Sequence, residues 1–70
     1  MDVRKLKAAM ALEGMTAVSV CKEIGIGHSA WFRKLNGTSQ FTQGEICKIR
    51  RLLNLDDHQT VEIFFNDIVS

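Results

Sequence analysis

The chain contains no proline, only two cysteines and no low-complexity tract. Because 46% of its residues are hydrophobic, this composition favours a compact fold over a disordered segment. No apolar run approaches the roughly 20 residues needed to span a bilayer. The first residues also lack the continuous apolar stretch of a signal peptide. We therefore expect a cytoplasmic protein without a membrane partner.

Residues that could bind a metal are few and widely separated. Cys21 and Cys47 stand 26 positions apart, and His28 and His58 stand 30 apart, so no short zinc-binding motif exists. We expect both cysteines to be reduced core residues. The spacing also gives no Ser-His-Asp or Cys-His set and no glycine-rich phosphate loop. The sequence therefore predicts no enzyme activity, metal, cofactor or small-molecule substrate.

The net charge is only +1, but the charged residues are unevenly distributed. Residues 1–55 hold all nine basic residues and four acidic ones, a net of +5, whereas residues 56–70 hold four acidic residues, a net of −4. A basic body of this kind can face phosphate groups while an acidic last helix points away or pairs with a partner. The charge distribution is thus compatible with nucleic-acid binding.

Apolar residues recur at helical spacing, and no run alternates in the way that a half-buried strand does. The length fits one small domain over residues 1–70. We expect an all-α fold of five helices. The predicted helices run from Asp2 to Gly14, from Thr16 to Ile24, from about His28 to Leu35, from Thr42 to Asn54 and over about 57–68.

Side chains that can cap a helix stand at several of the predicted helix starts. Thr16 is a good N-cap, and Thr42 with Glu45 has the spacing of a capping box. Asp56 with Gln59 has the same spacing. The residues expected in the core share helical stripes. They are Leu6, Ala9, Met10, Ala17, Val20, Cys21, Ile24, Trp31, Leu35, Ile46, Ile49 and Leu53.

The most informative segment is residues 25–37, with the sequence GIGHSAWFRKLNG. Gly25-Ile26-Gly27 predicts a tight turn that feeds a short helix. A connection of this length, often containing glycine, lets the second helix of a pair leave the first at a steep angle and enter the DNA major groove. We interpret residues 16–36 as a helix-turn-helix unit.

The helix after this turn has one polar face and one anchoring face. At roughly 100° per residue, Ser29, Phe32 and Arg33 share a stripe with Asn36, while Trp31 falls on the other side. Arg33 can make the bidentate contact with guanine, and Ser29 can bond a base edge or a phosphate. The alternative for Arg33 is a solvated surface charge.

Two further residues of this helix have more than one interpretation. His28 either reaches a base from the helix start or is a neutral surface residue. Phe32 packs on thymine methyl groups, meets a protein partner or folds back onto the domain, because an aromatic ring on a polar stripe is poorly hydrated alone. Both are candidate base contacts, with Ser29 and Arg33. The candidates for phosphate contact are Thr16, Lys34, Asn36 and Lys48.

A set of residues between 16 and 55 carries a family pattern, namely Thr16, the small Cys21, Ile24-Gly25-Ile26, Ser29, Leu35-Asn36-Gly37, Glu45-Ile46 and Leu52-Leu53. With these residues the chain resembles the lambda-repressor-like helix-turn-helix family, which includes phage repressors and Cro proteins. The resemblance implies a five-helix lambda-repressor-like DNA-binding domain. It also implies base-facing positions for His28, Ser29, Phe32 and Arg33, and a phosphate-facing one for Asn36.

Two departures from the family pattern keep a second function open. Many members carry Gln where this chain has Ala17, and small or polar residues are common where it has Phe32. Our first hypothesis is a sequence-specific transcriptional regulator, a phage or mobile-element repressor or Cro-like protein, that binds double-stranded DNA. The alternative is a protein-interaction module, an antirepressor or adaptor, that keeps the fold.

The apolar residues of the last predicted helix indicate self-association. Phe64, Phe65 and Ile68 recur at helical spacing in a domain too small to hide every aromatic, and family members commonly pair through this helix. A homodimer would favour a near-palindromic operator. The alternative is that Phe64 and Phe65 close the core of the monomer, and we expect at least one of them to do so.

Overall fold

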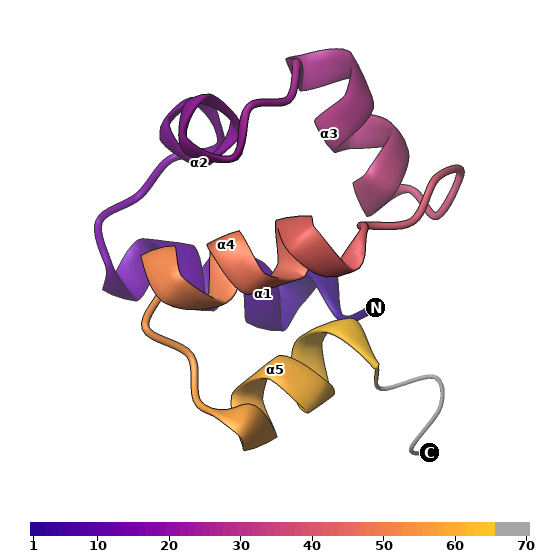
Figure 1. The fold of residues 1–70 in the computed structure, drawn as a ribbon. Helices are drawn as coiled ribbons and strands as arrows, with labels where there is room; N and C mark the ends of the chain where they lie inside the picture. Colours follow the sequence, from indigo (N-terminus) through magenta and orange to yellow (C-terminus); the bar gives the residue numbers. More distant parts are fainter. Residues whose placement is uncertain (66–70) are drawn as a thin grey trace.

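The computed structural model describes residues 1–65, which form five α-helices and contain no strand (Figure 1). The predicted all-α architecture is confirmed. Phe65 leaves helical geometry, with φ −125° and ψ 20°, so the last helix is shorter than predicted; residues 66–68 of that prediction lie outside the described part. The helices are α1 (Val3–Leu12), α2 (Ala17–Ile24), α3 (His28–Leu35), α4 (Gln43–Leu52) and α5 (Asp57–Phe64).

Local side-chain caps set the starts of α1, α2, α4 and α5, whereas α3 follows Gly27 without a side-chain cap. The side chain of Thr16 accepts from the N–H of Ser19, which confirms it as the N-cap of α2. The predicted capping boxes are both present, at the starts of α4 and α5. Such a cap contributes about 1 kcal/mol to helix stability. The predicted starts of α2, α4 and α5 are therefore correct because each depends on residues no more than three positions apart.

The helix ends follow from backbone geometry. Asn54 has a φ of 57° and ends α4, as predicted. The next N–H, that of Leu55, donates to the carbonyl oxygen of Arg50 at 3.0 Å, which is the long bond of a Schellman motif. This turn sends the chain back beneath α4 and into α5.

The core lies where α2 packs on α3 and α4, and where α1 packs on α5. In Figure 1, α4 crosses the middle of the molecule, with α2 and α3 on one side of it and α5 on the other. The N-terminus is held against α5, because the N–H of Asp2 donates to the carbonyl oxygen of Ile63 at 2.7 Å. The buried apolar side chains are Leu6, Ala9, Met10, Val20, Cys21, Ile24, Trp31, Ile49, Leu53, Leu55 and Ile63.

The core prediction needs corrections. Cys47 is exposed, not buried, because it follows Ile46 by about 100° and so turns away from the side that carries Ile49. Ala17, Leu35 and Ile46 are only half-buried. Across residues 1–65, no helix has the length and apolar character needed to cross a membrane.

Candidate functional site

The turn between α2 and α3 redirects the chain within three residues. Gly25 ends α2 with a φ of 78°, and the N–H groups of Gly25 and Ile26 both donate to the carbonyl oxygen of Cys21, at 2.9 and 3.0 Å. Gly27 is extended and starts α3. In Figure 1, α2 is seen along its axis while α3 is seen from the side, so the two helices cross steeply. The predicted tight turn is confirmed.

One side of α3 is anchored in the core. Trp31 is its only buried residue, with 2% of its surface exposed, and Leu35 packs half-buried against the same core. The Trp31 side chain also meets the ring of Phe41, which lies between α3 and α4. The prediction that Trp31 anchors this helix is correct.

The opposite side of α3 faces outward. His28, Ser29, Phe32, Arg33 and Asn36 are all exposed, and Phe32 retains 56% of its surface. The alternative in which Phe32 folds back into the domain is therefore wrong. Its ring lies near that of His28, with centroids 6.4 Å apart. Within residues 1–65 the guanidinium of Arg33 forms no salt bridge, so its donors are available to a ligand.

Lys34 is placed differently from its prediction as a phosphate contact. Its side chain is only 11% exposed, and its Nζ lies 2.9 Å from Oε1 of Glu45. The same Nζ donates to the carbonyl oxygen of Gln40 at 3.1 Å and lies over the ring of Phe41. Because Lys34 follows Trp31 by three positions, it lies on the inner flank of α3. Its ammonium is thus committed to groups of the protein itself.

Three other candidates for phosphate contact are exposed and come from three different parts of the fold. Thr16 lies at the start of α2, where its Oγ1 accepts from the N–H of Ser19 at 3.2 Å. Asn36 lies at the end of α3. Lys48 projects from α4 beside a shallow hollow that it forms with Glu23, Arg51 and Leu52. Through this hollow Lys48 is a neighbour of Glu23, a residue of α2.

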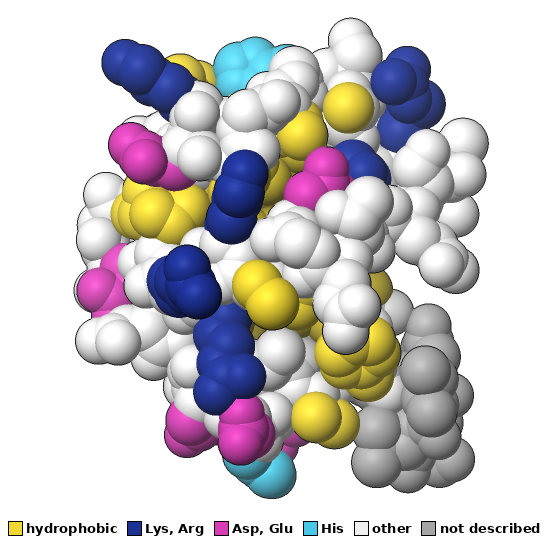
Figure 2. All heavy atoms as spheres, viewed as in Figure 1, with side chains coloured by type: hydrophobic (Ala, Val, Ile, Leu, Met, Phe, Trp, Pro, Cys, Tyr) yellow, Lys and Arg dark blue, Asp and Glu magenta, His cyan; other side chains and the backbone are white. Residues whose placement is uncertain are grey.

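A wider basic surface runs over α4. In Figure 2, Lys and Arg side chains form a column that crosses α4 and meets acidic side chains at the beginning of α5. Arg50 of α4 and Asp57 of α5 form an ion pair between these two helices. The basic residues of α4 and the acidic residues at the start of α5, which the sequence assigned to two oppositely charged regions, therefore lie in contact.

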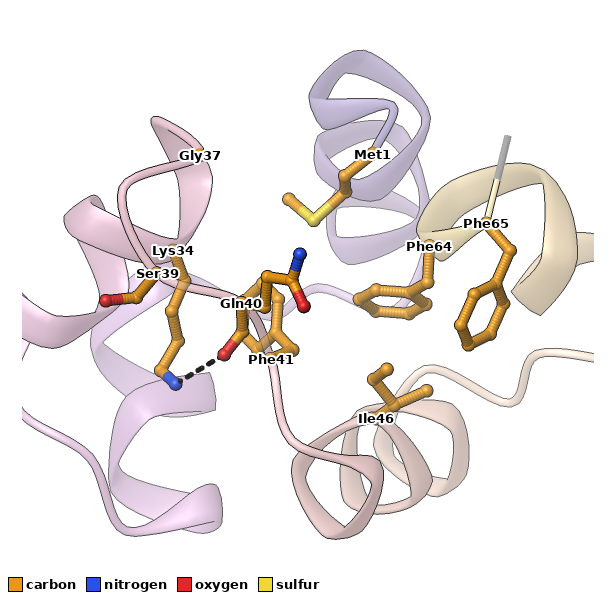
Figure 3. A pocket seen from close by; sticks show the side chains of 9 residues that line it. All are labelled: Met1, Lys34, Gly37, Ser39, Gln40, Phe41, Ile46, Phe64 and Phe65. Atoms are coloured by element: carbon orange, nitrogen blue, oxygen red, sulfur yellow. Dashed lines mark hydrogen bonds between the residues drawn. The ribbon is translucent and has the colours of Figure 1, made fainter. Parts of the chain in front are cut away.

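The two neighbouring aromatic residues at the end of α5, Phe64 and the Phe65 that follows the helix, have different surroundings. The ring of Phe64 is half-buried and meets that of Phe41, with centroids 5.6 Å apart, so Phe64 closes the monomer core, as expected of at least one of the pair. Phe65 is 37% exposed. Both line an open hollow of about 360 Å³ between the segment before α4 and the end of α5 (Figure 3). Ile68, the third predicted interface residue, lies outside the described residues.

Comparisons with known proteins add nothing to this geometry. No protein-family model matches the chain, and neither a curated protein nor a solved structure shows significant similarity to it. In residues 1–65 there is also no group of three or more His, Cys, Asp or Glu side chains arranged to hold a metal ion. The function must therefore be argued from α3 and its surroundings.

Proposed function

We propose that this chain is a sequence-specific DNA-binding transcriptional regulator of the lambda-repressor-like helix-turn-helix type, a phage or mobile-element repressor or Cro-like protein. The observation that carries the proposal is the two-sided character of α3. Trp31 is buried on one side, while Ser29 and Arg33 are exposed on the other. A short helix that is anchored in this way can enter the major groove with its polar stripe toward the base edges.

In the proposed mechanism the protein acts by occupying promoter DNA. Arg33 forms two hydrogen bonds with the O6 and N7 atoms of a guanine, and Ser29 and His28 bond neighbouring base edges or phosphate. Thr16 and Asn36, at the start of α2 and the end of α3, contact phosphate on either side. The bound protein represses by excluding polymerase from the promoter. No covalent step is required.

The test is selection of a binding site from a randomised duplex pool at low salt. The parent protein should enrich a sequence, and its binding should weaken steeply as salt rises. Arg33→Ala should lose about 1 to 3 kcal/mol of discrimination at one base position. Arg4→Ala is a matched control, because Arg4 is an exposed arginine of α1. If Arg33→Ala discriminates as well as the parent, Arg33 does not read a base.

We propose in addition that two copies pair through exposed apolar side chains of α5 and of Phe65, the residue that follows it. The supporting observation is that Val61 and Phe65 keep 39% and 37% of their surfaces exposed. Pairing would place two α3 helices about one DNA turn, roughly 34 Å, apart on a near-palindromic operator. Sedimentation should show a dimer that Phe65→Ser dissociates. A parent protein that sediments only as a monomer, with and without the selected DNA, would exclude this pairing.

The second candidate function is a protein-interaction module, such as an antirepressor or adaptor. The specific observation that favours it is the exposure of Phe32 at the centre of the polar face of α3, since exposed aromatic residues are typical of protein interfaces. The selection experiment separates the two functions. A pool from which no sequence is enriched would favour the interaction module.

A further inference from the structure

We infer that Lys34 and Glu45 form a positioning pair, which fixes the rotation of α3 about its own axis and hence the direction in which Arg33 and Ser29 project. The inference rests on the proposed function for its consequence at DNA, but not for the structural effect itself. Neither residue needs to touch DNA in this role.

A second anchor is needed because few buried side chains hold α3 in place. The helix has eight residues, and Trp31 is the only one that is buried. A short helix that is held along a single row of side chains can roll about that row. Lys34 projects from the flank of the row and reaches Glu45, a residue of α4. A contact placed off the row in this way resists the roll.

The anchor point on α4 is itself rigid. Oε1 of Glu45 accepts from the N–H of Thr42 at 2.9 Å, and Oγ1 of Thr42 accepts from the N–H of Glu45 at 3.1 Å. The same Oε1 accepts from Nζ of Lys34 at 2.9 Å. One carboxylate therefore closes the capping box of α4 and holds α3 against it. Figure 3 shows the other bond of this ammonium, to the carbonyl oxygen of Gln40.

The pair is sheltered from water, which makes it stronger than an ordinary surface pair. The side chains of Lys34 and Glu45 are only 11% and 16% exposed, and the ring of Phe41 lies beneath the ammonium, 5.6 Å from it. Partly buried pairs are screened by salt much less than exposed ones. Removal of one partner leaves the other poorly solvated.

The consequence for recognition follows from the position of Arg33, the neighbour of Lys34 in the sequence. A guanidinium lies at the end of a long side chain, so a small roll of α3 moves it far. Hydrogen bonds to base edges tolerate only a few tenths of an ångström around 2.9 Å. We therefore expect loss of the pair to reduce discrimination between sequences more than it reduces general affinity for DNA.

The experiment compares Lys34→Met with Glu45→Gln. Glutamine can still accept the hydrogen bond of a capping box, so the second change removes the charge while keeping the cap. Lys34→Arg retains the charge, so we expect this variant to behave like the parent protein. The matched controls are Lys7→Met and Glu13→Gln, because both residues are exposed and belong to the region of α1.

The first readout is amide hydrogen exchange without DNA. Both Lys34→Met and Glu45→Gln should speed exchange in α3 at least tenfold relative to α2 and α4, while Lys34→Arg and the controls should not. Unchanged exchange in α3 in both variants would overturn the inference. This measurement needs no DNA. It therefore tests the positioning pair even if the protein does not bind DNA, and failure of the inference can be distinguished from failure of the proposed function.

The second readout is binding to the selected duplex and to an unrelated one. Both variants should reduce the ratio of the two affinities by about tenfold and leave the salt dependence unchanged. If Lys34 instead contacts phosphate, the opposite pattern is expected. Lys34→Met would then lower the salt slope by about 1, while Glu45→Gln would release Lys34 and strengthen binding. That pattern would overturn the positioning role.

Discussion

The side chain of Trp31 meets the ring of Phe41 edge to face, with ring centroids 5.6 Å apart and planes inclined by 73°. Phe41 meets Phe64 in the same manner, at 5.6 Å and 80°. Edge-to-face pairs are a preferred arrangement of aromatic rings. This row of three rings joins α3 to α5 through the segment before α4, so the recognition helix proposed here is supported from the far end of the chain.

Phe41 is the central ring, and its loss should weaken the domain. We expect Phe41→Ala to lower the free energy of unfolding by about 3 kcal/mol, the low end of the range for this change, because Phe41 is only half-buried. Urea denaturation followed by circular dichroism measures it. Phe32→Ala, which truncates an exposed ring, should change stability by no more than about 0.5 kcal/mol. Equal losses in the two variants would contradict the assignment of Phe41 to the core.

Phe32 provides a test of contact with thymine methyl groups. Removal of a buried methyl group costs about 0.8 kcal/mol, so replacement of the contacted thymine by deoxyuridine should weaken binding of the parent about fourfold. Phe32→Ala should bind both duplexes equally. If deoxyuridine duplexes bind the parent as tightly as thymine duplexes, Phe32 does not pack on a methyl group and is better explained by a protein partner.

Gly25 should resist substitution for a backbone reason alone. Its φ of 78° is left-handed, yet nothing lies within 4 Å of an added Cβ. Gly25→Ala should therefore cost about 1 to 2 kcal/mol, the price of the left-handed conformation for a residue with a Cβ. The matched control is Gly44→Ala, which also has open space but lies within α4. That change should stabilise the protein by about 0.4 to 1 kcal/mol, and thermal denaturation of both variants measures the contrast.

Glu45 should make the fold sensitive to acid. Burial raises the pKa of this carboxyl, but the backbone N–H of Thr42 and the ammonium of Lys34 outweigh it, so the pKa of Glu45 lies below its ordinary value. A lowered folded-state pKa contributes stability that is complete above the unfolded pKa, about 4.3, and is lost as pH falls through the folded value.

The melting temperature should therefore fall as pH drops below about 5. Glu45→Gln should be less stable than the parent at pH 7 and should approach the parent at low pH, because the difference between them disappears once Glu45 is protonated. Glu13→Gln is the control. A difference between Glu45→Gln and the parent that is constant from pH 7 to pH 3 would show that the charge of Glu45 does not stabilise the fold.

Much of the fold could be predicted from short-range pattern. The caps at Thr16, Thr42 and Asp56 each depend on a partner three residues away, and the turn at Gly25 depends on the freedom of that glycine to adopt a positive φ. The outward direction of Arg33 follows from the burial of Trp31, since the two share one short helix. These features are local, and the sequence alone was sufficient for them.

Features that depend on how helices pack could not be predicted in this way. The partner of Lys34 is Glu45, 11 positions away and on another helix, so helical spacing made Lys34 look like a surface cation. Phe64 and Phe65 are neighbours with equal hydrophobicity, and only the docking of α5 against Phe41 decides that Phe64 turns inward.

The amino-acid sequence by itself thus determined where the helices start, about where the first four stop and which stripe of each is apolar, because those properties arise from interactions within a turn or two of the chain. Only the tertiary structure decided which charges pair, which of two adjacent aromatic rings is covered, and which cations remain available to a ligand. Those outcomes depend on distances between helices, which are set by the simultaneous burial of several apolar faces in one core.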